Sequence, residues 1–295
     1  MKPNFFIVGA AKSGTTSLDR YLNQHPQIFM APRKETHYFA TPDMPGEFRG
    51  PGDEPFTANL IRDEAEFLGM FDGATTERVI GESSVYYLYY PNSAQRIANM
   101  TPEAKVVIVL RDPVDRAYSA YMHVIRDGRE TLAFDQSVAR EAERKLNDYQ
   151  PLWFYREVGL YHEQVRHYLD VFGKERTHII LYDEFNAHPD KTLHGLLEFL
   201  GVDQQSTIDT SIRYNATGVP MGGLFQLATT SNPLTRLIKP LVPAKLREKL
   251  RFQAKNMTMQ KRPMAEDAQA QLRRYFADDV RRLEELLQRR LSAWT

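Results

Sequence analysis

Short apolar runs alternate along the chain with polar turns and with longer segments in which apolar residues recur at helical spacing. Continuous apolar runs of this length predict strands that are covered on both faces, as in a parallel sheet. Helical spacing follows the first run, at Leu18 and Leu22 after Gly14. Strands that alternate with helices predict an α/β fold, with a central parallel sheet flanked by helices in three layers. The clearest strands are Phe5–Val8, Val106–Leu110 and Thr177–Tyr182.

The remaining segments extend this pattern within one domain. Val79 begins another short strand, and a short apolar step lies at Ile28–Met30. No linker or low-complexity tract divides the 295 residues, so we predict a single domain over 1–295. Amphipathic helices are predicted at Phe134–Leu146, Leu160–Phe172, Asp190–Leu200 and Ala265–Leu291.

The turn between the first strand and the first helix has the features of a phosphate-binding loop. The first N–H groups of a helix have no partner within the helix and carry the positive end of its dipole, so they stabilise an anion. Gly14 opens this helix. The side chains that add a mobile cation and three hydroxyl donors are Lys12, Ser13, Thr15 and Thr16.

A second strand-to-helix turn carries a candidate anion-binding arginine. The strand Val106–Leu110 stops at Arg111, and Asp112 followed by Pro113 is typical of a helix start. Arg111 is therefore expected at the carboxyl end of the sheet, where open α/β folds bind ligands. Ser119 lies on the helix that follows. An arginine fork beside a hydroxyl suits a phosphate monoester.

Composition excludes several classes of function. Lys plus Arg and Asp plus Glu both number 38, so no overall basic field indicates nucleic-acid binding. The chain has no cysteine, which excludes disulfides and thiolate metal sites, and its histidines lack ligand spacing, so we expect no metal. No apolar run has the length of a membrane span, and the first strand begins almost at once. We therefore expect a soluble, cytoplasmic protein.

The two turns together resemble those of a known enzyme family. Gly9 and Gly14 have the spacing of the P-loop of nucleotide triphosphatases, GxxxxGK[ST], but Thr15 stands at the lysine position and the lysine lies upstream at Lys12. This KSGTTSL arrangement resembles the 5′-phosphosulfate loop of sulfotransferases that use 3′-phosphoadenosine 5′-phosphosulfate (PAPS), especially the heparan-type and bacterial branches. The resemblance implies a P-loop-like fold.

The second turn matches the family's 3′-phosphate signature, RDPxxRxxSxY, from Arg111 to Tyr121. The resemblance thus implies that Lys12 and residues 13–16 hold the 5′-phosphosulfate and that Arg111 and Ser119 hold the 3′-phosphate. It implies PAPS as donor, 3′,5′-ADP as product and no metal. An alternative interpretation pairs Arg111 with a neighbouring aspartate in an ordinary salt bridge.

The family's catalytic base lies in a KExHFF-like segment, which reads here from Lys34 to Phe39. Sulfuryl transfer to a hydroxyl needs a group that takes the acceptor's proton, and a carboxylate or an imidazole serves. Glu35 is the first candidate and His37 the second. Alternatively, Glu35 forms an ion pair with Lys34 on a solvated loop. Heparan-type enzymes also have a lysine where this chain has Ser83.

The segment at about 214–262 is irregular and is expected to form a lid or acceptor region. The resemblance places basic residues near the phosphates at Lys261 and Arg262. The basic amphipathic run at 232–255 is compatible with contact to an anionic acceptor or a membrane surface, or with a helix pair packed on the domain. The acceptor is expected to be a glycan, a glycolipid or a small molecule, and the oligomeric state is left open.

Two alternatives to a sulfotransferase remain at this point. Asp183 follows a predicted strand, as the acidic residue of a P-loop kinase or NTPase does. A catalytically silent nucleotide-binding protein would bind PAPS and transfer nothing.

Overall fold

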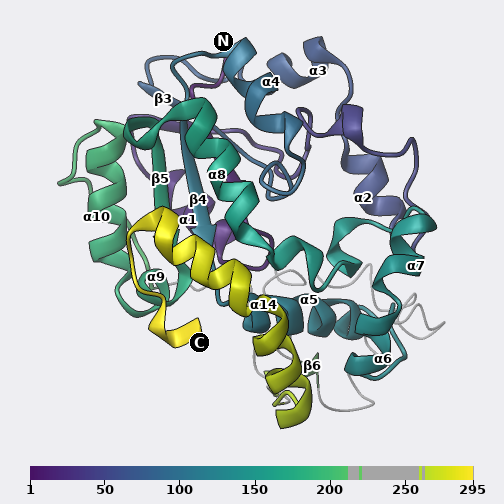
Figure 1. Cartoon of the computed structure of the whole chain (residues 1–295). Helices are drawn as coiled ribbons and strands as arrows, with labels where there is room; N and C mark the ends of the chain where they lie inside the picture. Colours follow the sequence, from purple (N-terminus) through teal and green to yellow (C-terminus); the bar gives the residue numbers. More distant parts are fainter. Residues whose placement is uncertain (212–218, 221–258, 261–262, 295) are drawn as a thin grey trace, which may run out of the picture.

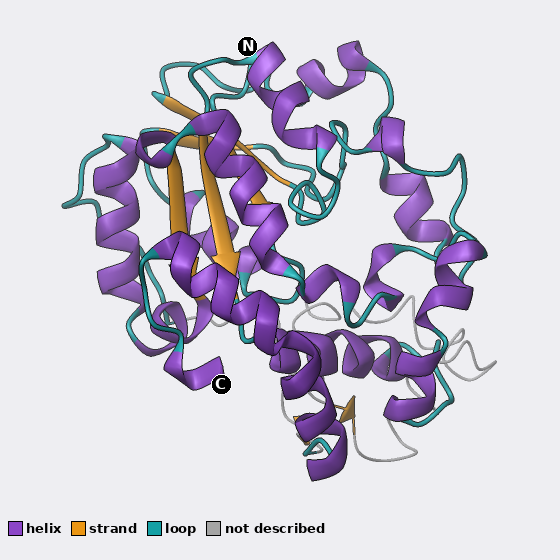
Figure 2. Ribbon diagram, viewed as in Figure 1, coloured by secondary structure: helices purple, strands orange, loops and turns teal. Residues whose placement is uncertain are grey.

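A five-stranded parallel sheet forms the centre of the computed structural model, which describes residues 1–211, 219–220, 259–260 and 263–294 (Figures 1 and 2). The strand order is β2-β3-β1-β4-β5, so β1 is central. All four pairings in this sheet are parallel. The strands are β1 (Phe5–Gly9), β2 (Ile28–Met30), β3 (Val79–Ser83), β4 (Lys105–Leu110) and β5 (Thr177–Leu181).

Helices cover both faces of the sheet. Alternate residues of a strand point to opposite faces, so Phe5 and Ile7 pack with α1 and α10, whereas Phe6 and Val8 pack on the side of α8 and α14. All four of these side chains are fully buried. Figure 1 shows α8 and α14 in front of the strands. The three-layer α/β fold that the sequence predicts is therefore confirmed.

Two long helices, α8 (Tyr161–Phe172) and α10 (Pro189–Leu200), have bounds within one residue of the predicted ones. The predicted helix starts after Gly14 and at Pro113 are those of α1 (Thr15–Leu22) and α5 (Pro113–Arg126). The other helices of eight or more residues among the described residues are α4 (Asn92–Met100) and α14 (Glu266–Leu287). Shorter helices among the described residues are α2 (Glu54–Asn59), α3 (Glu64–Gly69), α6 (Phe134–Ala139), α7 (Glu141–Leu146) and α9 (Tyr182–Ala187). Val219–Pro220 and Met259–Gln260 pair as the antiparallel strands β6 and β7.

Two predicted helices differ from the structure. The segment 134–146 is two helices, because the chain turns at Arg140, which ends α6 and precedes α7. The last helix ends at Leu287 instead of Leu291, because the next residue, Gln288, takes a left-handed conformation with φ of 52°. Leu291 lies beyond the helix and is still buried, so its apolar character reflects packing instead of helical periodicity.

The order of the strands places the two candidate loops side by side. The chain moves to one side of β1 to form β2 and β3, and to the other side to form β4 and β5. The carboxyl end of β1 therefore lies where the order reverses, which is the usual ligand site of open parallel sheets. Because β1 pairs directly with β4, the loop after Gly9 is adjacent to Arg111.

Candidate active site

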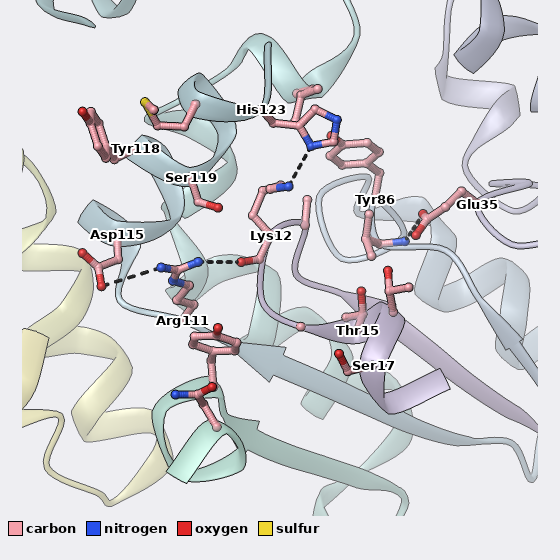
Figure 3. Close-up of a pocket in the computed structure, with 18 of the residues that line it drawn as sticks. Lys12, Thr15, Ser17, Glu35, Tyr86, Arg111, Asp115, Tyr118, Ser119 and His123 are labelled. Carbon is pink, nitrogen blue, oxygen red and sulfur yellow. Dashed lines mark hydrogen bonds and ion pairs between the residues drawn. The ribbon is translucent and has the colours of Figure 1, made fainter. Parts of the chain in front are cut away.

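A cavity of about 1140 Å³ opens at the carboxyl ends of β1 and β4. Most of the residues predicted from the two turns and from the base segment line it together. They are Lys12, Gly14, Thr15, Thr16, Glu35, His37, Arg111 and Ser119. Figure 3 shows Lys12 between the helix that carries Ser119 and His123 and the loop that carries Glu35.

Backbone constraints shape the first loop of the cavity. Ala10 donates its N–H to the carbonyl of Val109 on β4 at 2.7 Å, which ties the loop to the neighbouring strand. Gly14 has φ of 84°, a left-handed conformation that suits glycine, and a Cβ there would lie 3.0 Å from the ring of Tyr182. Because Gly14 turns the chain in this way, the first turn of α1 begins at the cavity wall.

Arg111 joins the two loops. One of its terminal nitrogens donates to the carbonyl oxygen of Lys12 at 3.2 Å, and its guanidinium lies over the ring of Tyr182, 4.8 Å from the ring centre. The other terminal nitrogen lies 3.9 Å from the Asp115 carboxylate, so the salt bridge of the alternative interpretation is present with a long distance (Figure 3). Asp112 instead accepts from Val114 at the start of α5 and pairs with Arg273, as its role at the helix start predicts.

Ser119 and Arg111 keep polar atoms that no described residue satisfies. The Ser119 hydroxyl is buried, and neither it nor Nε of Arg111 has a hydrogen-bond partner within the described ranges. Buried polar atoms are usually paired, so such atoms at a cavity wall indicate a missing partner. A ligand with acceptor oxygens meets this requirement.

Lys12 reaches across the cavity to α5. Its Nζ lies 2.7 Å from Nδ1 of His123, and Nε2 of that histidine lies 3.2 Å from a carboxylate oxygen of Asp127 (Figure 3). Desolvation, followed by the nearby cations Arg126 and Arg111, lowers the pKa of Lys12 to about 7. Burial lowers the pKa of His123 to about 4, so this imidazole is neutral at physiological pH. His123 lies beyond the signature that ends at Tyr121, and no sequence motif pointed to it.

The segment with the candidate base is held in an unusual backbone conformation. Glu35 and His37 have φ of 59° and 52°, both left-handed, which is uncommon for residues other than glycine and is frequent at functional sites. Glu35 accepts the N–H of Val85 at 3.0 Å, and Nζ of Lys34 lies 3.8 Å from its other oxygen. The predicted ion pair with Lys34 is thus present only as a loose contact, and Glu35 still lines the cavity.

Glu35 and His37 face each other. Nε2 of His37 lies 3.4 Å from Oε2 of Glu35. Its ring packs against those of Phe56 and Tyr86, with both ring centres 5.2 Å away, and these two rings also contact each other. Burial raises the pKa of Glu35, while Lys34 opposes this shift. Burial also lowers the pKa of His37 to about 3, so the imidazole is neutral beside the carboxylate.

Glu82 stabilises this segment through hydrogen bonds with Thr36 and Ser84. It is fully buried on β3, and one carboxyl oxygen accepts from Ser84 at 2.6 Å and from Thr36 at 3.2 Å. Ser84 in turn accepts the N–H of His37 at 3.0 Å. Burial raises the pKa of Glu82 to about 8, so it is protonated at neutral pH. The contact with Thr36 could not be predicted from the local sequence, because the two residues are 46 positions apart.

The far part of the cavity combines aromatic and polar walls. Phe56, Tyr86 and Leu152 line it together with Arg129 and Gln150. By contrast, Tyr87 is fully buried in the core, so the tyrosines after β3 divide between wall and core. Ser83, at the position of the family lysine, is 1% exposed and is absent from the residues that line this cavity.

One predicted binding residue does not line the cavity, and two others are outside the described residues. Ser13 is fully buried, its N–H donates to the carbonyl of Ala10, and it is not among the cavity residues; its hydroxyl, like that of Ser119, has no partner among the described residues. Lys261 and Arg262 lie outside the described residues, as does the run 232–255.

Asp183, the acidic residue of the kinase alternative, is the second residue of α9 and also lines the cavity. Within the described part of the chain, no three His, Cys, Asp or Glu side chains are grouped so that they would hold a metal ion. In the same residues, no helix is both long and apolar enough to span a membrane.

Comparison with known sequences identifies relatives. A profile of the sulfotransferase family matches residues 3–206. The membrane-associated sulfotransferase kil1 of Dictyostelium discoideum is 26% identical over 68% of this chain and 56% of its own length. Mouse carbohydrate sulfotransferase 15 is also 26% identical, over 68% of this chain and 44% of its own length. The chain thus spans about half the length of these curated relatives.

Comparison of structures gives a fuller match. A crystal structure of a sulfotransferase from Alicyclobacillus acidocaldarius is 44% identical, with a TM-score of 0.81, and the match covers 100% of this chain and 99% of that one. The profile covers more than half of the chain, and the structural match extends over nearly all of both proteins. The chain therefore belongs to the sulfotransferase family.

Proposed function

We propose that this sulfotransferase uses PAPS as its donor and moves the sulfuryl group to a hydroxyl or amine of an acceptor. The observation that supports this proposal is that one cavity is lined by Lys12 and Arg111, from two loops about a hundred residues apart. PAPS has anionic groups at two separated positions, the 5′-phosphosulfate and the 3′-phosphate. Two adjacent anion-binding loops suit a donor of this shape.

The 3′-phosphate is assigned to Arg111 and Ser119. The guanidinium presents donors to phosphate oxygens in a planar fork, and the buried hydroxyl of Ser119 has no partner among the described residues. A 5′-diphosphate or triphosphate without a 3′-phosphate would leave the Ser119 hydroxyl and Nε of Arg111 without a partner. Arg111 and Ser119 thus hold the donor in position and take little part in the transfer step itself.

The 5′ end is assigned to Lys12 and to the beginning of α1. Gly14, Thr15 and Thr16 line the cavity at that helix end, where main-chain N–H groups favour an anion. PAPS, when bound, supplies the sulfuryl group and a phosphate as leaving group. Lys12 stabilises the negative charge that develops on the leaving oxygen.

Glu35 is assigned as the base, with His37 as the alternative. As the acceptor oxygen bonds to sulfur, its proton passes to the Glu35 carboxylate, and the electron pair of the broken S–O bond remains on the phosphate. His37 is neutral and lies 3.4 Å from Glu35, so it can orient the carboxylate or take the proton itself. Both residues have the left-handed backbone conformation described above.

The acceptor is proposed to be a carbohydrate, a glycolipid or a small molecule. Relatives are named as carbohydrate sulfotransferases, and the wall formed by Phe56 and Tyr86 offers flat apolar surfaces for a sugar or another ring. One relative is named as membrane-associated, and the cytoplasmic location expected from the sequence stays a prediction.

Thermal unfolding with different nucleotides tests the donor assignment, because a ligand that binds the folded state raises its stability. We expect 3′,5′-ADP to raise the melting temperature more than 5′-ADP or ATP with Mg²⁺ at equal concentration. A larger shift with ATP and Mg²⁺ would favour the kinase or NTPase alternative. Binding of PAPS without formation of 3′,5′-ADP, in a screen of sugars and alcohols, would favour a catalytically silent protein.

A further inference from the structure

Lys12 is the first member of a chain of three side chains that continues onto α5. Its Nζ contacts Nδ1 of His123 at 2.7 Å, and Nε2 of His123 lies 3.2 Å from Asp127. Arg126 holds the same Asp127 through its other oxygen at 2.9 Å. His123 and Asp127 are four residues apart, so they lie on one face of α5 and its end.

The order of these contacts fixes the hydrogen positions of the histidine. A carboxylate only accepts hydrogen bonds, so Asp127 requires the proton of the neutral ring on Nε2. Nδ1 then carries a lone pair, and this lone pair faces the Lys12 amine. Lys12 has a flexible stem with several rotatable bonds, and a fixed acceptor restricts where its amine lies.

We propose that His123, oriented by Asp127, is a positioning residue that holds the Lys12 amine in the cavity as a hydrogen-bond donor. This inference rests on the proposed function, in which Lys12 stabilises the leaving oxygen. A pre-placed amine does not have to be ordered during the reaction. Neither His123 nor Asp127 belongs to the signature that ends at Tyr121, so the assignment comes from geometry alone.

The surroundings of Lys12 make the acceptor on His123 important. A neutral imidazole that accepts from the amine favours its protonated form, which is the form that stabilises negative charge. The other charged groups that act on Lys12 come from the turn after β4, from α5 and its end, and from the base segment. They are Arg111, Arg116, Arg126, Asp127 and Glu35, and the three arginines oppose protonation of Lys12. Lys34 and Asp19 act in addition on Glu35.

Two substitutions of similar size separate positioning from packing. The side-chain oxygen of Asn lies close to the position of Nδ1, so His123→Asn keeps an acceptor, whereas His123→Leu removes it. We expect His123→Leu to lower kcat about tenfold to a hundredfold while the KM for PAPS changes less than about threefold. His123→Asn should recover most of this loss, and thermal unfolding of both variants checks that they fold.

A second measurement needs neither donor nor acceptor. Acetic anhydride labels only unprotonated amines, so the pH dependence of Lys12 acetylation, followed by mass spectrometry without nucleotide, reports the protonation of this residue. We expect the midpoint to move to lower pH in His123→Leu, because a desolvated ammonium group loses its acceptor, and to stay near the wild-type value in His123→Asn.

The two measurements give distinct failures. Equal midpoints in the wild type and both variants, or equal kcat in the Leu and Asn variants, would overturn the role of His123. If the midpoints move as expected but the wild type neither binds 3′,5′-ADP nor consumes PAPS, the contact is upheld and the proposed function fails.

Discussion

The guanidinium of Arg111 donates to the main-chain oxygen of Lys12 at 3.2 Å, so the two anion-binding loops are in direct contact. The loops follow β1 and β4, which are neighbours in the sheet. Separate anion sites on opposite sides of the molecule would have contradicted a single donor that spans both. The contact instead places the proposed 3′-phosphate and 5′-phosphosulfate sites on one wall of one cavity.

Replacement of Arg111 tests the 3′-phosphate site. We expect Arg111→Ala to weaken binding of 3′,5′-ADP by about tenfold to a hundredfold, which corresponds to the loss of charge-assisted hydrogen bonds worth about 1.5–3 kcal/mol. Binding of 5′-ADP should change much less, because it lacks the group that Arg111 holds. Calorimetry with both nucleotides measures the difference, with Arg49→Ala, at an exposed arginine, as the control. Equal weakening of both nucleotides would remove Arg111 from this site.

Replacement of Glu35 tests the assignment of the base. Glu35→Gln keeps the shape of the side chain but cannot take a proton, so we expect turnover to fall by about a hundredfold or more. Affinity for 3′,5′-ADP should stay nearly unchanged. Formation of 3′,5′-ADP from PAPS, with water or a screened acceptor, measures turnover, and the exposed Glu47→Gln is the matched control. Retained turnover in Glu35→Gln together with loss in His37→Gln would assign the base to His37.

The pH dependence of transfer should have two limbs. The proposed mechanism requires Glu35 ionised and Lys12 protonated, so kcat/KM should rise with pH through the pKa of Glu35, which burial raises, and fall through that of Lys12, at about 7. Lys34 lowers the pKa of Glu35. Lys34→Gln should therefore move the acid limb to higher pH, while Lys34→Arg should leave it in place. An acid limb that is unmoved in Lys34→Gln would show that it belongs to another group.

Glu82 should make the protein less stable as pH rises. The pKa of Glu82 is about 8 in the folded chain, whereas the ordinary value of 4.5 applies to the unfolded chain. Between pH 4.5 and about 8 the folded state therefore binds more protons than the unfolded state. The free energy of unfolding should fall with pH in this window, by at most about 1.4 kcal/mol per pH unit from this group. Glu82→Gln has no proton to lose, so denaturant unfolding from pH 5 to 8 should show a flatter profile. An unchanged slope in Glu82→Gln would contradict a protonated carboxyl.

Local patterns in the sequence were enough to predict the sheet and the two loops. Strand ends, the glycine turn at Gly14 and the helix start at Asp112 depend on residues close in the chain, so their pattern is visible without a structure. The same applies to the cavity positions of Lys12 and Arg111, because parallel strands bring their carboxyl ends to one edge.

Features that depend on distant contacts could not be predicted in this way. His123 contacts a residue 111 positions away, and Glu82 gains its role from Thr36, 46 positions away. Ser13 has a hydroxyl in a suitable motif, yet the turn directs it inward. The break at Arg140 was missed because the residues on both sides of it keep the apolar spacing of one helix.

Because β1 pairs directly with β4, the length of β4 determines how far Arg111 lies from Lys12. A strand advances about 3.3 Å per residue, so an insertion or deletion in Lys105–Leu110 would displace Arg111 by that length while Lys12 stayed in place. A slip by one residue would also exchange the two faces of β4. To engineer the protein for a donor whose anionic groups are farther apart or closer together, the length of β4 should therefore be changed before any side chain in the cavity.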